Sequence, residues 1–177
     1  MAIVLAIVGG FASLSGCTQE GSSPKPIVQR ATGAPTAVAT ADAEEAAVIA
    51  AYTHSWEAQT EAYSKASSAG TDLRKSTTFK ALAGIERDLS AMQKAGQVTT
   101  GQPAIDPKVV TVTDAKIPKA TVSDCVDTTR WALIDKASKK KVPLPTERLI
   151  KYVSTATLEK WGTTWMVTEL TAQNQAC

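Results

Sequence analysis

The sequence predicts an α+β fold in which helices come first and consecutive antiparallel strands follow. Two observations support this order. Apolar residues recur at helical spacing from Asp42 to Lys94, and beyond Gly101 the pattern changes to short runs rich in β-branched side chains. Turn residues separate these runs without a helical stretch between them, so a βαβ arrangement is not expected.

The first helix is expected to begin at Asp42. Asp42 and Glu45 have the spacing of a capping box, in which side-chain acceptors meet the free amide groups of the first turn. Residues 67–70 supply the turn residues that end this helix. Its large side chains fall on one face, namely Ile49, Tyr52, Trp56 and Tyr63.

A second helical region is expected between Asp72 and Lys94, with Thr71 or Asp72 as its cap. Phe79 is expected to lie in a separate short turn, because Gly84 weakens a single long helix. The apolar residues at helical spacing in this region are Leu82, Ile85, Leu89 and Met92.

The second half of the chain predicts a sheet of about four strands. In the longest of them Cys125, Trp131 and Leu133 share one alternation, so we expect them on one face. The expected strands are residues 109–112, 121–135, 149–158 and 165–170, and turn signals at 116–118, 137–145 and 161–163 separate them.

Composition and charge limit the classes of protein to which the chain can belong. The chain has 177 residues, enough for one ordinary domain, and 44% of them are hydrophobic, which gives that domain a core. The formal net charge is only +2 and no dense basic stripe is present, so nucleic acid is not an expected partner. The cluster Lys139–Lys141 has two interpretations: a solvated hairpin tip, or a surface that approaches anionic lipid or cell-wall polymer.

The N-terminal residues have the character of an export signal. Residues 2–14, AIVLAIVGGFASL, carry no charge and are too few to cross a bilayer comfortably, a length that suits a signal-peptide core. Leu14-Ser15-Gly16-Cys17 follows, and this order of aliphatic, small, small and cysteine resembles the lipobox of bacterial lipoproteins. No Lys or Arg precedes the apolar run, which departs from the usual positive start of a signal peptide.

The resemblance to lipoproteins implies a division of the chain into three parts. Residues 1–16 would be a cleaved signal peptide, and a diacylglycerol on the sulfur of Cys17 would anchor the chain to the outer face of the cell membrane. Residues 17–41, rich in Gly, Ser, Pro, Ala and Thr, would be a disordered tether. Residues 42–177 would be the folded domain.

The number of cysteines agrees with export. Three cysteines in an exported chain leave one unpaired. If Cys17 is lipidated, Cys125 and Cys177 remain as one pair, whose loop of about 53 residues would stabilise the fold by about 4 kcal/mol. Two free thiols are the alternative.

A second resemblance covers residues 42–177. The segments Val122–Trp131 and Trp165–Leu170, with the terminal cysteine, resemble the NTF2-like (cystatin-like, SnoaL-like) fold of actinobacterial secreted proteins and lipoproteins. This resemblance implies a cone, in which N-terminal helices pack on a curved antiparallel sheet of about four strands. It also implies that Cys125 bonds to Cys177. Members of the family include isomerases, cyclases, dehydratases and non-catalytic binding modules, so activity must be argued from the site.

Few residues are candidates for catalysis. Asp124 and Asp127 fall on opposite faces of a regular strand, so at most one of them faces a cavity. Asp127 is a weak candidate for a catalytic base, and a structural role, pairing with Arg130 or capping a bulge, is the alternative. His54, the only histidine, is expected at the boundary of the helix stripe, and it excludes a multi-histidine metal site. No metal or cofactor is expected.

Aromatic residues are the candidates for binding. The four tryptophans and three tyrosines are expected either to line an apolar cavity or to form the core, with Tyr52, Trp56, Trp131 and Trp165 as the first candidates for the lining and Tyr63, Tyr152 and Trp161 as further ones.

Two classes of function are therefore expected. The first is a non-catalytic, lipid-anchored envelope protein that binds an envelope protein or a hydrophobic ligand. The second is a SnoaL- or ketosteroid-isomerase-like enzyme that acts on a small hydrophobic substrate with Asp127. A weaker alternative is a phage-carried surface lipoprotein that blocks reinfection.

Overall fold

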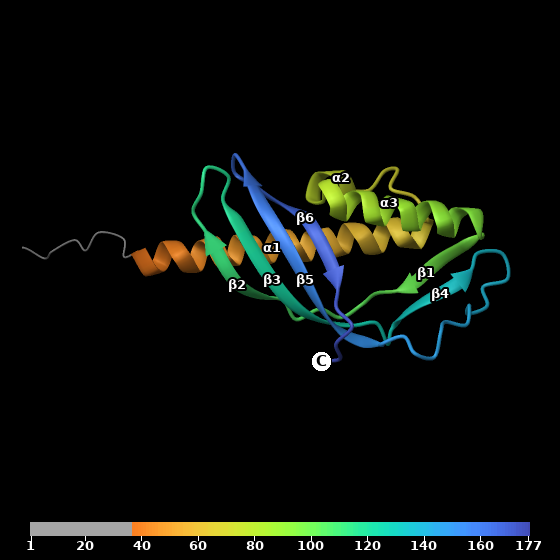
Figure 1. Cartoon of the computed structure of the whole chain (residues 1–177). Helices are drawn as coiled ribbons and strands as arrows, with labels where there is room; N and C mark the ends of the chain where they lie inside the picture. Colours follow the sequence, from red (N-terminus) through yellow and green to blue (C-terminus); the bar gives the residue numbers. More distant parts are fainter. Residues whose placement is uncertain (1–36) are drawn as a thin grey trace, which may run out of the picture. The chain divides into compact units, whose positions relative to one another are not determined.

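The computed structural model describes residues 37–177, with side chains from residue 41 on. The expected signal peptide, Cys17 and most of the expected tether lie outside the described residues. Three helices come first, α1 (Ala37–Lys65), α2 (Leu73–Ser76) and α3 (Phe79–Lys94), and all strands follow them (Figure 1). The predicted α+β class is therefore confirmed.

The strands form two antiparallel sheets. The larger sheet has four strands in the order β2-β3-β5-β6, and the smaller one pairs β1 with β4. The bounds are β1 (Gln97–Gly101), β2 (Lys108–Thr113), β3 (Lys119–Asp127), β4 (Trp131–Asp135), β5 (Lys151–Trp161) and β6 (Thr164–Ala172). Figure 1 shows α1 running across one side of the large sheet, with the smaller sheet beside the C-terminal part of the helix.

The start of α1 differs from the prediction. The helix begins at Ala37, so Asp42 lies within it and does not cap it. The segment around Asp42 is rich in Ala and Glu, which are strong helix formers, and the helix extends through it. The expected apolar stripe is present at Tyr52 and Trp56, but Val48 rather than Ile49 is its fully buried first member.

The break in the second helical region lies before Phe79 and not at Gly84. Thr77 adopts an extended backbone between α2 and α3, and its fully buried Oγ1 lies 2.8 Å from Ser55 Oγ of α1. The Thr78 N–H donates to the carbonyl of Val167 in β6 at 2.8 Å. These bonds to α1 and β6 hold the break at this place, and α3 continues through Gly84 with Ala81, Ile85 and Leu89 buried.

The expected single strand 121–135 is two strands that belong to different sheets. β3 ends at Asp127, and a turn in which the Trp131 N–H donates to the Thr128 carbonyl leads into β4. β4 pairs with β1, a strand that the sequence pattern did not predict. Gly101, the last residue of β1, has a left-handed backbone with φ of 75°, and a Cβ there would collide with the Arg130 carbonyl oxygen.

The core lies between α1 and one face of the large sheet. Every second residue of β3 is buried from Ala120 to Val126, so this face packs on the helix and the other face points outward. A second, smaller cluster joins the three helices. The main cluster comprises Val48, Tyr52, Trp56, Ala81, Ala120, Val122, Val126, Ala156, Leu158, Trp165 and Val167.

A disulfide crosses the outer face of the large sheet. Cys125 of β3 is bonded to Cys177, with their Cα atoms 5.8 Å apart. The preceding residues also bond to β5, since the Gln173 N–H donates to the Val153 carbonyl and the Val153 N–H donates to the Gln175 carbonyl. The C-terminal segment is therefore fixed to the sheet, and the pairing predicted for these two cysteines is present.

Among the described residues, no helix combines the length and the apolar character needed to span a membrane.

Candidate ligand-binding site

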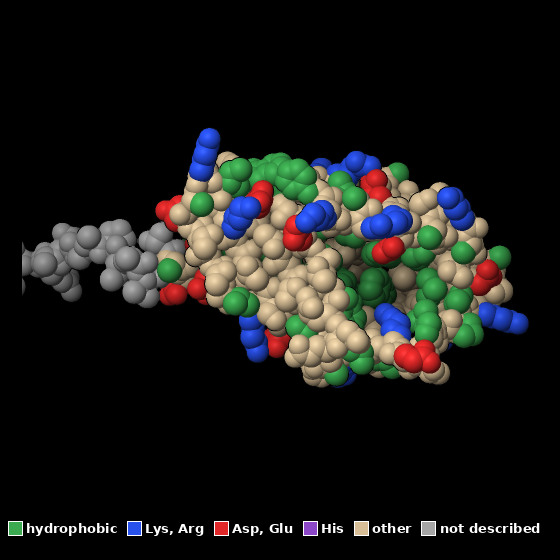
Figure 2. All heavy atoms as spheres, viewed as in Figure 1, with side chains coloured by type: hydrophobic (Ala, Val, Ile, Leu, Met, Phe, Trp, Pro, Cys, Tyr) green, Lys and Arg blue, Asp and Glu red, His purple; other side chains and the backbone are tan. Residues whose placement is uncertain are grey.

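A hollow of about 210 Å³ lies where α1 and α3 face the ends of β4, β5 and β6. Figure 2 looks into it, between the large sheet and the smaller one, and its floor is hydrophobic. Four aromatic side chains and two aliphatic ones form most of the wall: Trp56, Tyr63, Trp131, Tyr152, Ile85 and Leu170. The polar lining consists of Gln59, Asp88 and Ser154.

The aromatic wall is held by edge-to-face contacts. The ring of Trp131 in β4 packs against Trp56 at 6.1 Å and against Tyr63 at 5.5 Å between centroids, with interplanar angles of 78° and 80°. Each such pair contributes about 0.5–1.5 kcal/mol beyond its buried area. The two contacts therefore fix the smaller sheet to α1 and set the width of the hollow.

Two indole groups at this wall lack hydrogen-bond acceptors. The Nε1 atoms of Trp56 and Trp131 are buried, and neither has a partner among the described residues. Trp56 as a whole is only 6% exposed. A buried donor without an acceptor costs about 1–3 kcal/mol.

The polar lining is mostly neutral. Tyr63 donates its hydroxyl proton to Asp88 Oδ2 at 3.1 Å, and burial together with the negative charge of Asp88 raises the pKa of this tyrosine. Burial also raises the pKa of Tyr152. Gln59, which is buried, donates from Nε2 to Ser55 Oγ at 3.1 Å. The hollow thus offers apolar surface, protonated tyrosines and one carboxylate, a set that suits a weakly polar ligand.

The interior carboxylate of the domain is Asp124, which lies in the core. Its Oδ2 accepts a hydrogen bond from Tyr52 Oη at 2.8 Å, and its Oδ1 accepts one from the Asp106 N–H at 2.6 Å. Burial raises the pKa of Asp124, and burial together with the Asp124 charge raises the pKa of Tyr52. These hydrogen bonds connect α1, β3 and the segment before β2. Neither Tyr52 nor Asp124 lines the hollow.

Asp127, the weak catalytic candidate, does not face the interior. It lies on the outer face of β3, where Lys151 of the neighbouring strand approaches its Oδ2 at 2.9 Å. The Thr129 N–H donates to Oδ1 at 2.8 Å. Hydrogen bonding to the side chain of Thr129, then to Lys151 and to the Thr129 N–H, holds the pKa of Asp127 well below its usual range. The expected partner Arg130 is not the one observed. Asp127 lies on the outer face because successive residues of a strand point to opposite faces, and Asp124, three positions earlier, points inward.

The predicted pocket residues are divided between different places. Trp56 and Trp131 line the hollow, as do Tyr63 and Tyr152. Tyr52 is buried in the core, and Trp165 lies apart from the hollow, with its indole Nε1 donating to Glu44 at 2.8 Å. Trp161 is neither a lining nor a core residue, since it is 40% exposed and packs against Phe79. The sequence pattern missed Gln59, Asp88, Ser154 and Leu170 as lining residues. Only Gln59 carried a signal, since it lies three residues after Trp56 and four before Tyr63 on one helix.

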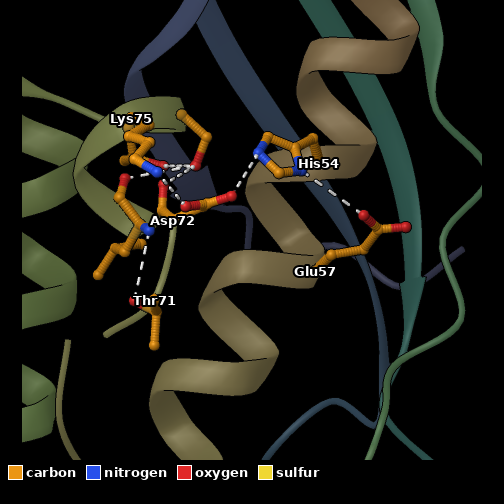
Figure 3. A network of polar contacts seen from close by, with 8 residues as sticks. His54, Glu57, Thr71, Asp72 and Lys75 are labelled. Atoms are coloured by element: carbon orange, nitrogen blue, oxygen red, sulfur yellow. Dashed lines mark hydrogen bonds and ion pairs between the residues drawn. The ribbon is translucent and has the colours of Figure 1, made fainter. Parts of the chain in front are cut away.

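His54 belongs to a surface network (Figure 3). Its side chain is 49% exposed, and its ring nitrogens lie 3.7 Å from Glu57 and 3.8 Å from Asp72. Asp72 also pairs with Lys75 at 2.8 Å, and Lys75 lowers the pKa of that carboxyl group. The network joins α1 to the start of α2. Within residues 37–177, no group of three or more His, Cys, Asp or Glu side chains is arranged to hold a metal ion.

Comparisons with known proteins assign no family. No protein-family model matches the sequence. No curated protein sequence matches it either. Among solved structures, the fold is similar to the crystal structure of the intermembrane space region of the chloroplast protein ARC6, with a TM-score of 0.44 and 13% sequence identity over 75% of this chain and 97% of that one.

Proposed function

We propose that this chain is a lipid-anchored, extracytoplasmic protein whose NTF2-like domain binds a small, largely apolar ligand. The observation that carries the ligand proposal is the aromatic hollow, whose wall of four aromatic and two aliphatic side chains offers apolar surface beside a short polar lining. A ligand with an apolar body and one polar group would cover the wall and meet the polar lining of Gln59, Asp88 and Ser154.

The NTF2-like part of the proposal is supported by the arrangement of the layers. Helices cover one face of an antiparallel sheet of four strands, and the hollow lies at one end between them. The Asp-Cys-x-Asp segment and the terminal cysteine carry the resemblance to the family, and these two cysteines are bonded.

The extracytoplasmic part is supported by the same disulfide, because such bonds form and persist in oxidising compartments. The lipobox Leu14–Cys17 supports the anchor. Mass spectrometry of the mature N-terminus tests it: a diacylglycerol on Cys17 is expected, and an unmodified Cys17 or a cut elsewhere would contradict it.

The size of the hollow restricts the ligand. At about 210 Å³ it is smaller than the 300–1,000 Å³ of sites for drug-sized molecules. A single ring system or the end of an acyl chain fits this volume. Asp88 at the wall disfavours a ligand that carries a negative charge there.

A hollow-filling variant tests ligand binding. Gly84 lines the hollow on α3, and a Cβ built there meets only the Arg87 side chain, at 3.7 Å. Gly84→Leu should therefore fill the hollow without strain while raising helix propensity by about 1 kcal/mol. With 2-naphthol as a fluorescent, neutral probe, we expect wild type to bind and Gly84→Leu to lose binding by at least about tenfold.

Ala83→Leu is the matched control, because Ala83 is exposed on the same helix. It should bind the probe as wild type does. Equal binding by Gly84→Leu and Ala83→Leu would show that the probe does not occupy the hollow.

The isomerase-like alternative remains a prediction with less support. Asp127 lies on the outer face beside Lys151, and the interior Asp124 is buried in the core and does not itself line the hollow. No carboxylate at the hollow other than Asp88 is available as a base among the described residues.

A further inference from the structure

Positive charge is concentrated in one segment of the domain. Residues 128–150, here called the basic segment, contain six Lys or Arg side chains and two acidic ones, a net charge of +4. The whole chain has a net charge of +2, so the remaining residues together carry −2. No ion pair involves the six cations anywhere in residues 37–177, whereas eight ion pairs between Lys or Arg and a carboxylate form elsewhere in that part of the chain.

Lys139–Lys141 follow an ordered turn. The Asp135 carboxylate accepts hydrogen bonds from both the N–H and the hydroxyl of Ser138, each at 2.7 Å. The Lys139 N–H donates to the Asp135 carbonyl, and the Val142 N–H donates to the Leu133 carbonyl at 3.0 Å. The backbone that carries Lys139–Lys141 is therefore fixed by the fold, and the three side chains are exposed.

Apolar side chains accompany the charges. A depression of about 370 Å³ in this segment is lined by Lys141 and Arg148 together with Leu144 and Ile150. Leu144 is 41% exposed and Ile150 is 56% exposed. An anionic bilayer presents phosphates at its surface and hydrocarbon beneath them. Cations without ion-pair partners match the phosphates, and the exposed aliphatic groups beside them match the hydrocarbon. A soluble polyanion would meet the charges but not the aliphatic groups.

We infer that the basic segment is a docking surface for an anionic phospholipid bilayer, with Lys140, Lys141 and Arg148 on the phosphates and Leu144 and Ile150 at the acyl boundary. The segment lies at the far end of the domain from the start of α1 (Figure 1). A helix of 29 residues is about 43 Å long. Contact at this end therefore adds a second membrane contact, which is independent of the ligand proposed for the hollow.

Vesicle sedimentation tests this surface. The test variant is Lys140→Gln with Lys141→Gln and Arg148→Gln, and the matched control is Arg87→Gln with Lys94→Gln and Lys116→Gln, three exposed cations outside the segment. Each set lowers the net charge equally. All proteins are full chains, so any contribution of the N-terminal residues is the same in each.

On vesicles that contain phosphatidylglycerol, the test variant should partition roughly 100-fold more weakly than wild type, while the control stays close to wild type. On vesicles of phosphatidylcholine alone, the difference between wild type and test variant should disappear. Equal losses in the test variant and the control would overturn the proposal, because net charge alone would then explain binding.

A second variant separates a bilayer from a soluble polyanion. Leu144→Gln with Ile150→Gln keeps every charge of the segment and should weaken partitioning onto phosphatidylglycerol vesicles by about tenfold, since it removes the aliphatic contact. Unchanged partitioning of this variant would show that the surface recognises charge alone and would overturn the bilayer as its partner.

Discussion

On the inner face of β3 the carboxyl group of Asp124 is buried against α1, whereas on the outer face Asp127 lies beside Lys151 at the surface. The two residues are three positions apart in one strand. Burial raises the pKa of Asp124, and hydrogen bonds from Thr129 and Lys151 lower that of Asp127. The difference shows that the period of a strand alone places similar carboxylates in opposite environments.

The outer face also depends on a covalent bond, which gives the largest expected effect. Replacing Cys125 and Cys177 by Ser should lower the free energy of unfolding by about 4 kcal/mol, because the unfolded chain regains the freedom of the closed loop. This corresponds to a fall in Tm of about 12 °C. Calorimetry of the double variant measures it.

Hydrogen exchange shows where this loss acts. The amide of Val153, bonded to the Gln175 carbonyl, should exchange faster in the double variant, while amides around Val122 keep their order of protection. A double variant as stable as wild type would show that the outer face does not need the bond.

The inner face gives the next largest effect. Asp124→Ala removes the acceptor of both the Tyr52 hydroxyl and the Asp106 N–H, and should lower the free energy of unfolding by about 3 kcal/mol. Urea unfolding measures the loss. Asp127→Ala is the matched control and should cost much less, and an equal cost for both would contradict the contrast between the two faces.

Much of this contrast could be predicted from the sequence. The alternation of β3 placed Asp124 and Asp127 on opposite faces, and the helical spacing of Tyr52 and Trp56 placed both on the buried side of α1. Which face of the strand is the inner one depends on where α1 docks, and that contact joins residues 72 positions apart.

The aromatic hollow was less accessible to prediction for a related reason. Trp131 meets Trp56 only because the chain leaves the large sheet after Asp127 and forms β4 with β1. β1 has a single buried apolar side chain, Val98, so its alternation is too weak to identify it as a strand. The sequence pattern therefore merged β3 and β4, and several wall residues were missed.

A smaller loss of stability is expected when Tyr52, the residue whose hydroxyl donates to Asp124, is changed. Tyr52→Phe keeps the buried ring and removes only the hydroxyl that donates to Asp124, so it should cost about 1.5 kcal/mol in the free energy of unfolding. Urea unfolding at neutral pH measures it. In the Asp124→Asn background the same substitution should cost less, because the hydrogen bond to a charged acceptor is already lost. Equal costs in both backgrounds would show that Tyr52 acts through packing alone.

The smallest effect is a difference in pH dependence between the two carboxylates. The lowered pKa of Asp127 means that it contributes stability above the unfolded pKa of about 3.9, and this contribution is lost as the pH falls through the folded pKa. For Asp124, whose pKa is raised, the dependence of stability on pH has the opposite sign. Its contribution is fully present below about pH 3.9 and is lost as the pH rises through its folded pKa.

Asparagine variants isolate these two contributions, since each removes one titrating group and keeps its shape. In urea unfolding across acidic to neutral pH, the advantage of wild type over Asp127→Asn should shrink on acidification. The stability of wild type relative to Asp124→Asn should instead rise over the same range. Both residues belong to one strand, so a general effect of acid on the fold would change the stability difference between wild type and each Asn variant in the same direction. That result would show that Asp124 and Asp127 do not respond to pH in opposite ways.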